Sequence, residues 1–169
     1  MVRFVLHGVK ARVFGTLGDA SACTRQIGLA EHAFSGVRSG NTPDWMASFL
    51  CEAHVASVTG QAAYALARAT NEFSCDAHDR LAGAIAAFDE SRARAVALCS
   101  TRLAALHLRA GNLDDGIHAA RTALDAAPGL RSARITRDLV AVRSAADQRP
   151  HDSTRELSTQ ITDALALTV

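Results

Sequence analysis

The chain has 169 residues, of which 49% are apolar and only 5% aromatic, and its formal net charge is +1. This length fits one domain whose core consists mainly of Ala, Leu, Val and Ile side chains. The near-neutral charge argues against a broad nucleic-acid footprint, and no segment approaches the roughly 18 apolar residues of a membrane span. The N-terminal residues lack the apolar run of a signal peptide, so we expect a cytoplasmic protein.

A first helical hairpin is predicted over residues 2–35, because apolar residues recur there with a 3.6-residue period. Its first helix carries an apolar stripe that we expect to face the core: Val2, Leu6, Val9, Val13 and Leu17. Gly18 should end this helix, and Asp19 should cap the next one. The second helix has an inward stripe of its own: Cys23, Ile27, Ala30 and Phe34.

A second hairpin is predicted over residues 43–90. Its first helix, roughly Pro43–Ala69, begins with proline in the first turn, where the missing N–H costs nothing. Gly60 within this helix costs about 1 kcal/mol relative to alanine, and close approach of a neighbouring helix is the usual compensation. Ser74 or Asp76 should cap the following helix. The inward positions of that helix are Ala77, Leu81, Ala84, Ile85 and Phe88.

The clearest hairpin is predicted over residues 92–128, with its first helix opening at Ser91. Gly111 should end that helix in a left-handed conformation, and Asn112 should cap the second one. Small residues stand where the two helices must approach closely: Ala104, Gly116, Ala120 and Ala123. Because alanine is the better helix former, we expect Gly116→Ala to be neutral or stabilising by up to about 1 kcal/mol.

A fourth hairpin is predicted over residues 131–167. Its first helix has an apolar stripe at Ile135, Leu139, Val142 and Ala146. Ser153 and Glu156 have the spacing of a capping box for its second helix. That helix should face inward with Leu157, Ile161 and Leu165. The four hairpins predict an all-α fold, a solenoid of about four stacked hairpins in one domain over residues 1–169.

The hairpin around Gly111 resembles a tetratricopeptide repeat, a helix pair of about 34 residues that buries its apolar face by stacking on copies of itself. Further stretches extend the likeness: 42–50, 91–95, 129–134 and Pro150-His151. Together they resemble the C-terminal tetratricopeptide-like region of actinobacterial helix-turn-helix transcriptional regulators. The resemblance implies a regulatory module that binds a ligand or protein. Because the first repeat begins almost at Met1, we expect no DNA reading by this chain.

A candidate binding groove follows from the repeat register, because stacked repeats use the surface lined by the first helix of each pair. The predicted groove residues are Arg12, His54, Ser57, Gln61, Tyr64, Thr101 and Arg109. This mixture of polar, aromatic and cationic groups suits an extended peptide, a protein segment or a small polar ligand.

Two Cys-x-x-His pairs, Cys51/His54 and Cys75/His78, could each present two zinc ligands on one helix face. In a simple hairpin, however, Cys51 would lie roughly 24 Å along the helix from the other pair. We therefore expect no metal, no cofactor and four reduced cysteines in the core.

No nucleophile has a partner that is visible in the sequence, so we expect no catalytic residues and no enzyme. A metal-assisted helical enzyme using His54 is an alternative. The other alternative is a self-associating scaffold, a homodimer formed through the apolar segment 164–169.

Overall fold

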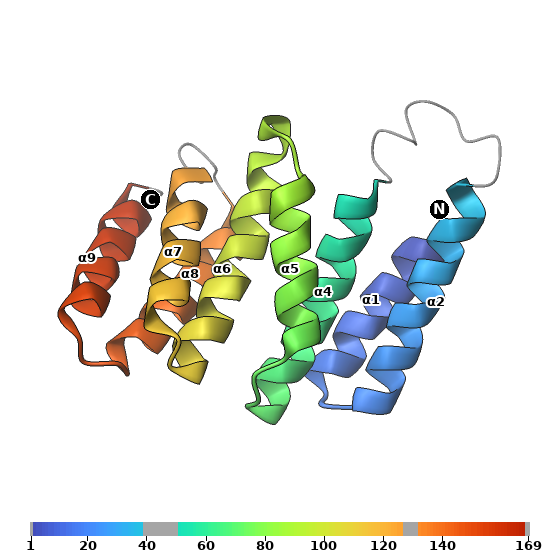
Figure 1. Cartoon of the computed structure of the whole chain (residues 1–169), viewed down its shortest axis with the longest axis horizontal. Coiled ribbons are helices and arrows are strands. Elements are labelled where there is room, and N and C mark those ends of the chain that lie inside the picture. The colour runs from blue at the N-terminus through green and yellow to red at the C-terminus, as the bar shows by residue number, and fades with distance from the viewer. Residues whose placement is uncertain (1, 39–50, 127–131, 168–169) are drawn as a thin grey trace. The chain divides into compact units, whose positions relative to one another are not determined.

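A computed structural model gives the fold of the chain and describes residues 2–38, 51–126 and 132–167. All regular structure in these ranges is helical (Figure 1), so the predicted all-α fold class is confirmed. The chain divides into two compact units, Met1–Ala87 and Phe88–Val169, which we describe separately. Within the described ranges, no helix is both long enough and apolar enough to cross a bilayer.

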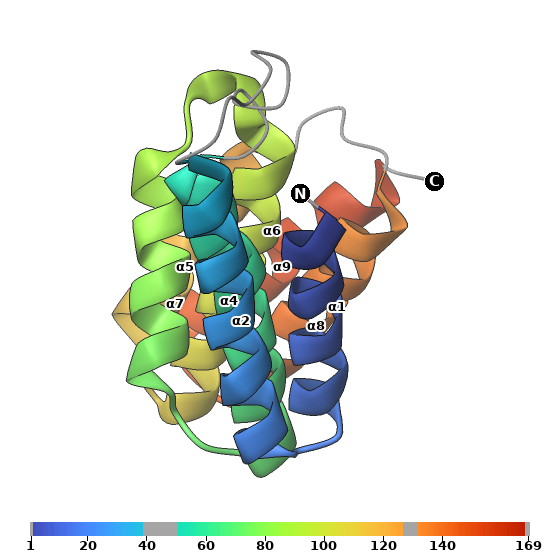
Figure 2. The same cartoon turned by 90° about the vertical axis from the view of Figure 1, so that its right-hand side faces the viewer.

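The first unit contains two helical hairpins. In the first hairpin α1 (Val2–Thr16) pairs with α2 (Ala20–Arg38), and in the second α4 (Glu52–Thr70) pairs with α5 (Cys75–Ala87). Helix α4 also packs against both α1 and α2, as Figure 2 shows from the side of this unit. The predicted start of the long third helix at Pro43 lies outside the described residues.

The predicted helix ends of this unit are largely correct. Gly18 follows α1 with a φ of +76°, a left-handed conformation that glycine adopts without steric penalty. The backbone N–H of Ala22 donates to the carboxylate of Asp19 over 2.9 Å, so Asp19 caps α2. Of the two predicted caps for α5, Ser74 is the one used: its hydroxyl accepts from the N–H of Ala77 over 3.1 Å.

The side of helix α1 that faces the core is not the side that the sequence predicts. The buried residues are Phe4, Gly8, Ala11 and Gly15. The stripe expected to be buried is exposed instead: Val2, Leu6, Val9, Val13 and Leu17. The predicted stripe of α2 is correct, and all four of its residues are buried: Cys23, Ile27, Ala30 and Phe34. One core cluster contains Phe4, Phe34 and Val55, with the two phenyl rings 6.3 Å apart.

Close approach of α1 and α4 explains this orientation. A Cβ atom placed on Gly8 would lie 2.5 Å from Cγ1 of Val58, and one on Gly15 would lie 2.6 Å from the carbonyl oxygen of Ala62. These distances leave no room for a Val or Leu side chain at positions 8 and 15 of α1. The glycine-containing stripe is therefore buried, and the valine-containing stripe remains outside.

The second unit also contains two hairpins. A short 3-10 helix η1 (Glu90–Arg92) leads into α6 (Ala93–Ala110), which pairs with α7 (Leu113–Ala126). Helix α8 (Ala133–Asp147) then pairs with α9 (Asp152–Ala166). Helix α6 packs against α8, and α7 packs against α9. Every residue of α6 from position 97 to position 108 is buried.

The turn between α6 and α7 confirms the prediction for Gly111, which has a φ of +90° and donates its N–H to the carbonyl of Leu108 over 3.2 Å. The predicted close approach of the two helices is also present, because a Cβ on Gly116 would lie 2.7 Å from Cγ of Leu108. The same distance argues against the accompanying expectation that alanine fits well at Gly116, because Leu108 would have to shift.

Two helix starts in the second unit differ from the predictions. Helix α6 begins at Ala93, after a 3-10 turn in which the Asp89 carboxylate accepts from the N–H of Ser91 over 2.9 Å. Helix α9 is capped by His151, whose Nδ1 accepts from the N–H of Ser153, while Thr154 Oγ1 accepts from the His151 N–H. The predicted capping box was misplaced because the cap of α9 is His151, two residues before Ser153.

Candidate functional site

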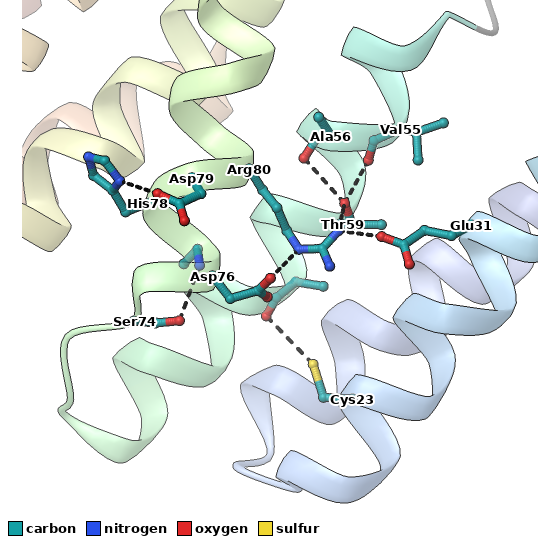
Figure 3. Close-up of polar contacts among 12 residues, drawn as sticks. Cys23, Glu31, Val55, Ala56, Thr59, Ser74, Asp76, His78, Asp79 and Arg80 are labelled. Carbon is teal, nitrogen blue, oxygen red and sulfur yellow. Dashed lines mark hydrogen bonds and ion pairs between the residues drawn. The ribbon is translucent and has the colours of Figure 1, made fainter.

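The most connected polar cluster of the first unit is centred on Arg80 in α5, which joins three helices (Figure 3). Its Nε donates to Asp76 over 2.6 Å, and its Nη1 donates both to Glu31 of α2 and, over 3.0 Å, to Thr59 of α4. Burial acts to lower the pKa of Arg80, but the hydrogen bonds with Glu31 and Asp76 outweigh it and raise that pKa. The guanidinium therefore stays charged and fixes α2, α4 and α5 together.

Thr59 is suited to this position because its hydroxyl has a donor and an acceptor role. It donates to the carbonyl of Val55 over 2.8 Å and accepts from Arg80, so this fully buried hydroxyl is satisfied. A Cβ on the next residue, Gly60, would lie only 3.0 Å from Cβ of Arg80. The glycine thus permits the close approach of α4 and α5, as the sequence predicts.

A cavity of about 290 Å³ lies beside this cluster, between α2, α4 and the turn into α5. Its buried lining is apolar: Cys23, Ile27, Ala63 and Ala67. Its exposed and half-buried lining has five polar residues, Thr24, Thr70, Glu72, Ser74 and Asp76, and three apolar ones, Ala20, Leu66 and Phe73. The volume is near the lower limit of small-ligand pockets, about 300 Å³, and it matches one apolar side chain or a small molecule.

The buried part of the cavity is uncharged and suits an apolar group, and of its two carboxylates Asp76 is already paired with Arg80. Burial, and then the negative charges of Asp76 and Asp19, raise the pKa of the Cys23 thiol, so it remains protonated at neutral pH. Its Sγ lies 3.8 Å from the carbonyl oxygen of Ala62. The charged residues lining the cavity are Glu72 and Asp76, and both are exposed.

In the second unit, Arg102 of α6 and Asp138 of α8 form an ion pair with an Nη2–Oδ2 distance of 3.1 Å. Their side chains are only 7% and 15% exposed. Asp138 also lies 3.6 Å from Nε of the exposed Arg137, so its carboxylate faces two guanidinium groups. The Arg102–Asp138 pair links α6 to α8 and helps to fix how these helices pack.

Four of the predicted groove residues lie along one side of α4. The ring of His54 packs 5.8 Å from the ring of Phe4, and Gln61 Nε2 donates to Ser57 Oγ over 3.0 Å. His54 and Gln61 are half-buried, whereas Ser57 and Tyr64 are buried. The fifth residue in this unit, Arg12, lies on α1 and is half-buried.

The two remaining groove residues lie on α6 in the second unit. Thr101 is buried and donates to the carbonyl of Leu98 over 3.1 Å. The Arg109 side chain is exposed, and its backbone carbonyl accepts from Nη2 of Arg149 over 2.6 Å. The structure thus brings four groove residues together on α4, and the assignment of all seven to one groove stays a prediction.

The prediction that all four cysteines belong to the core is half right. Cys23 and Cys99 are buried, but Cys51, the residue before α4, and Cys75, the first residue of α5, are exposed. Beside Cys75, Nδ1 of His78 lies 2.9 Å from the carboxylate of Asp79. Within the described ranges, no three His, Cys, Asp or Glu side chains come close enough to hold a metal ion.

Comparison of the chain with protein-family models, with curated proteins and with solved structures gave no match. Sequence reasoning missed the Arg80 cluster and the cavity. The four-residue spacing of Asp76 and Arg80 is a visible signal for an ion pair on one helix face. The cavity has no such signal, because its lining comes from separate helices and from the turn before α5.

Proposed function

We propose that this chain is a binding module with the architecture of a tetratricopeptide-like α-solenoid, and that it serves as the sensory or interaction part of a transcriptional regulator system. One observation carries the proposal. In each unit two successive hairpins pack through their first helices, α1 against α4 and α6 against α8. Stacked repeats pack in this way, and they bind partners on the surface that their first helices line.

The chemistry of the helix contacts supports the same architecture. Small residues mark the contacts between helices at Gly8 and Gly15 of α1, at Gly60 of α4 and at Gly116 of α7. A repeat that stacks on its neighbours needs such residues, because bulky side chains would keep the helices apart. The module itself reads no DNA in this proposal. It binds a peptide, a protein segment or a small ligand.

The proposed contact residues are those on the polar side of α4 in the first unit and, in the second unit, the exposed side chain of Arg109 on α6. The half-buried His54 and Gln61 offer hydrogen-bonding groups there. The cavity between α2, α4 and α5 supports a binding role independently, because it offers an apolar pocket with carboxylates at its entrance.

The test compares two glutamine variants. Partners are captured on the immobilised chain, and each captured molecule is then titrated against the wild type, Gln61→Ala and Gln160→Ala by isothermal calorimetry. Gln160 is the matched control, since it is also half-buried and donates to a side chain four residues earlier, Glu156, over 3.0 Å.

We expect Gln61→Ala to weaken binding several-fold and Gln160→Ala to leave it unchanged. Arg109→Ala should act like Gln61→Ala, with the exposed Arg134 of α8 as its control. Equal binding by all variants would show that the surface is assigned wrongly. Failure to capture any molecule would contradict the binding role.

A self-associating scaffold is a second candidate because Leu167, directly after α9, is 88% exposed. Self-association through this residue predicts a dimer by light scattering that Leu167→Ser dissociates. A concentration-independent monomer would exclude it.

A further inference from the structure

Helix α1 presents an apolar surface to solvent. Large apolar side chains are exposed at ten positions of the described residues, and six of these lie between residues 2 and 17: Val2, Val5, Leu6, Val9, Val13 and Leu17. The side chains of Leu6, Val9 and Val13 are 47%, 46% and 50% exposed. The opposite side of the same helix is buried against α2 and α4. The apolar residues of the outer surface therefore take no part in the core of this unit.

The spacing of these residues is that of a helix-packing seam. Val2, Leu6, Val9 and Val13 follow one another at steps of four, three and four residues. This is the a/d spacing of a heptad, in which side chains of one helix insert between those of a second helix. A surface with this pattern is complementary to another amphipathic helix.

The charged residues beside the seam indicate which kind of helix would bind there. Arg3 and Lys10 lie along one edge at e positions, and Arg12 lies along the other edge at a g position. Helix α1 contains no acidic residue. Antiparallel pairing of α1 with α1 of a second copy would place Arg3 opposite Lys10 across the seam, which is unfavourable. Parallel pairing would give neither residue an acidic partner. A helix with acidic residues at its e and g positions would form ion pairs instead.

We infer that the outer face of α1, defined by Val2, Leu6, Val9 and Val13, is a docking surface for an acidic amphipathic helix of another protein. The partner helix inserts its apolar seam between these side chains and sets its carboxylates opposite Arg3 and Lys10. This surface is separate from the α4 residues of the proposed groove, and the following test avoids Arg12, which belongs to both. Either proposal can therefore fail alone.

The test uses two synthetic peptides of three heptads each. Both have Leu and Ile at the a and d positions; one carries Glu at every e and g position, and the other carries Lys there. Fluorescence anisotropy measures the binding of each labelled peptide to the full chain. We expect the Glu peptide to bind at least about tenfold more tightly than the Lys peptide, with an affinity that falls as salt is added.

Two variants of α1 and one control variant of α8 test whether the peptide binds on α1. The double variant Leu6→Ser/Val9→Ser should weaken binding of the Glu peptide about tenfold or more, whereas Val140→Ser, a change at a 42% exposed residue of α8, should have no effect. The charge reversal Arg3→Glu/Lys10→Glu should invert the preference between the two peptides. Circular dichroism verifies that each variant keeps the helical content of the wild type.

Several outcomes would overturn the inference. Equal affinity for both peptides would remove the charge argument, and failure of both to bind would remove the docking surface. A dimer in light scattering that Leu6→Ser/Val9→Ser dissociates would identify a second copy as the occupant. Co-sedimentation with anionic vesicles, abolished by the same variant, would identify a lipid surface instead.

Discussion

Gly15→Ala distinguishes the observed orientation of α1 from the one that the apolar pattern predicts. If the valine stripe faced the core, Gly15 would be exposed, and alanine there would stabilise the helix by up to about 1 kcal/mol. In the structure, a Cβ on Gly15 lies 2.6 Å from the carbonyl oxygen of Ala62 and 3.1 Å from the backbone nitrogen of Leu66. Both atoms belong to the backbone of α4, so no change of rotamer can relieve the contact.

The magnitude follows from the separation that this contact enforces. Carbon and carbonyl oxygen ordinarily stay about 3.3 Å or more apart, so α1 and α4 must move apart by roughly 0.7 Å near Gly15. A gap of about 0.5–1 Å forfeits a quarter to a half of the dispersion attraction of the facing atoms. Overpacking costs about 1–3 kcal/mol, and a backbone contact places this case near the upper limit. After the helix propensity of alanine is subtracted, the net loss is about 2 kcal/mol.

Urea denaturation followed by circular dichroism at 222 nm measures the effect. The matched control is Gly28→Ala in α2, where a Cβ would meet no heavy atom of the described residues within 4 Å. Gly28→Ala should raise the midpoint, with a gain of about 0.5–1 kcal/mol, while Gly15→Ala should lower it.

An unchanged or raised midpoint for Gly15→Ala would refute the close approach of α1 and α4. It would also refute the proposed docking surface, because the valine stripe would then be free to face the core. A lowered midpoint for Gly28→Ala would show that alanine is disfavoured for a reason other than space.

Three further predictions concern other parts of the chain. Gly116→Ala should lower the stability of the second unit by about 1 kcal/mol, because its Cβ would lie 2.7 Å from Cγ of Leu108; a higher urea midpoint would contradict the observed helix contact. In thiol titration of the native chain Cys51 should react at once and Cys23, which is buried and has a raised pKa, only after unfolding; rapid reaction of all thiols would be inconsistent with the core of the first unit. Hydrogen bonds from the adjacent turn hold the pKa of Asp89 below its ordinary value, so its contribution to stability is present at neutral pH and is lost as pH falls through that lowered pKa. The destabilisation caused by Asp89→Ala should therefore shrink in acid, and a pH-independent difference would exclude the cap.

Periodicity predicted the helices well wherever one stripe of a helix was clearly the most apolar. In α8 the expected stripe at Ile135, Leu139 and Val142 is buried as predicted. In α9 Leu157 and Ile161 are buried as predicted, whereas Leu165 is only half-buried. The other large side chains of these helices are mostly polar, so the hydrophobic effect favours one orientation.

Local backbone chemistry was predictable where it depends on one residue. Gly18 and Gly111 both have positive φ, a backbone conformation that glycine adopts easily because it has no Cβ atom. Capping was less predictable because several polar residues compete near each helix start. At α9 the His151 side chain serves as the cap in place of Ser153, one consequence of the helix beginning at Asp152.

The cavity and the Arg80 cluster show why the candidate site was harder to predict. Glu31, Thr59 and Arg80 are far apart in sequence and meet only because α2, α4 and α5 pack together. No spacing rule relates residues on different helices. Only the local pair of Asp76 and Arg80 was visible beforehand.

Helix α1 carries two stripes with the same four-three-four spacing, and periodicity alone cannot decide between them. The stripe of Phe4, Gly8, Ala11 and Gly15 is less apolar, but it alone permits the approach of α4. Packing of this unit therefore accounts for the glycines and leaves the valines without a role in the core. The outer side of α7, in contrast, is polar at Asp114, His118 and Arg121. A solvent-facing helix side needs no valine seam, since exposed apolar surface only adds a tendency to associate. The presence of such a seam on α1, with only basic residues as its charged neighbours, is what the proposed helix-binding surface requires.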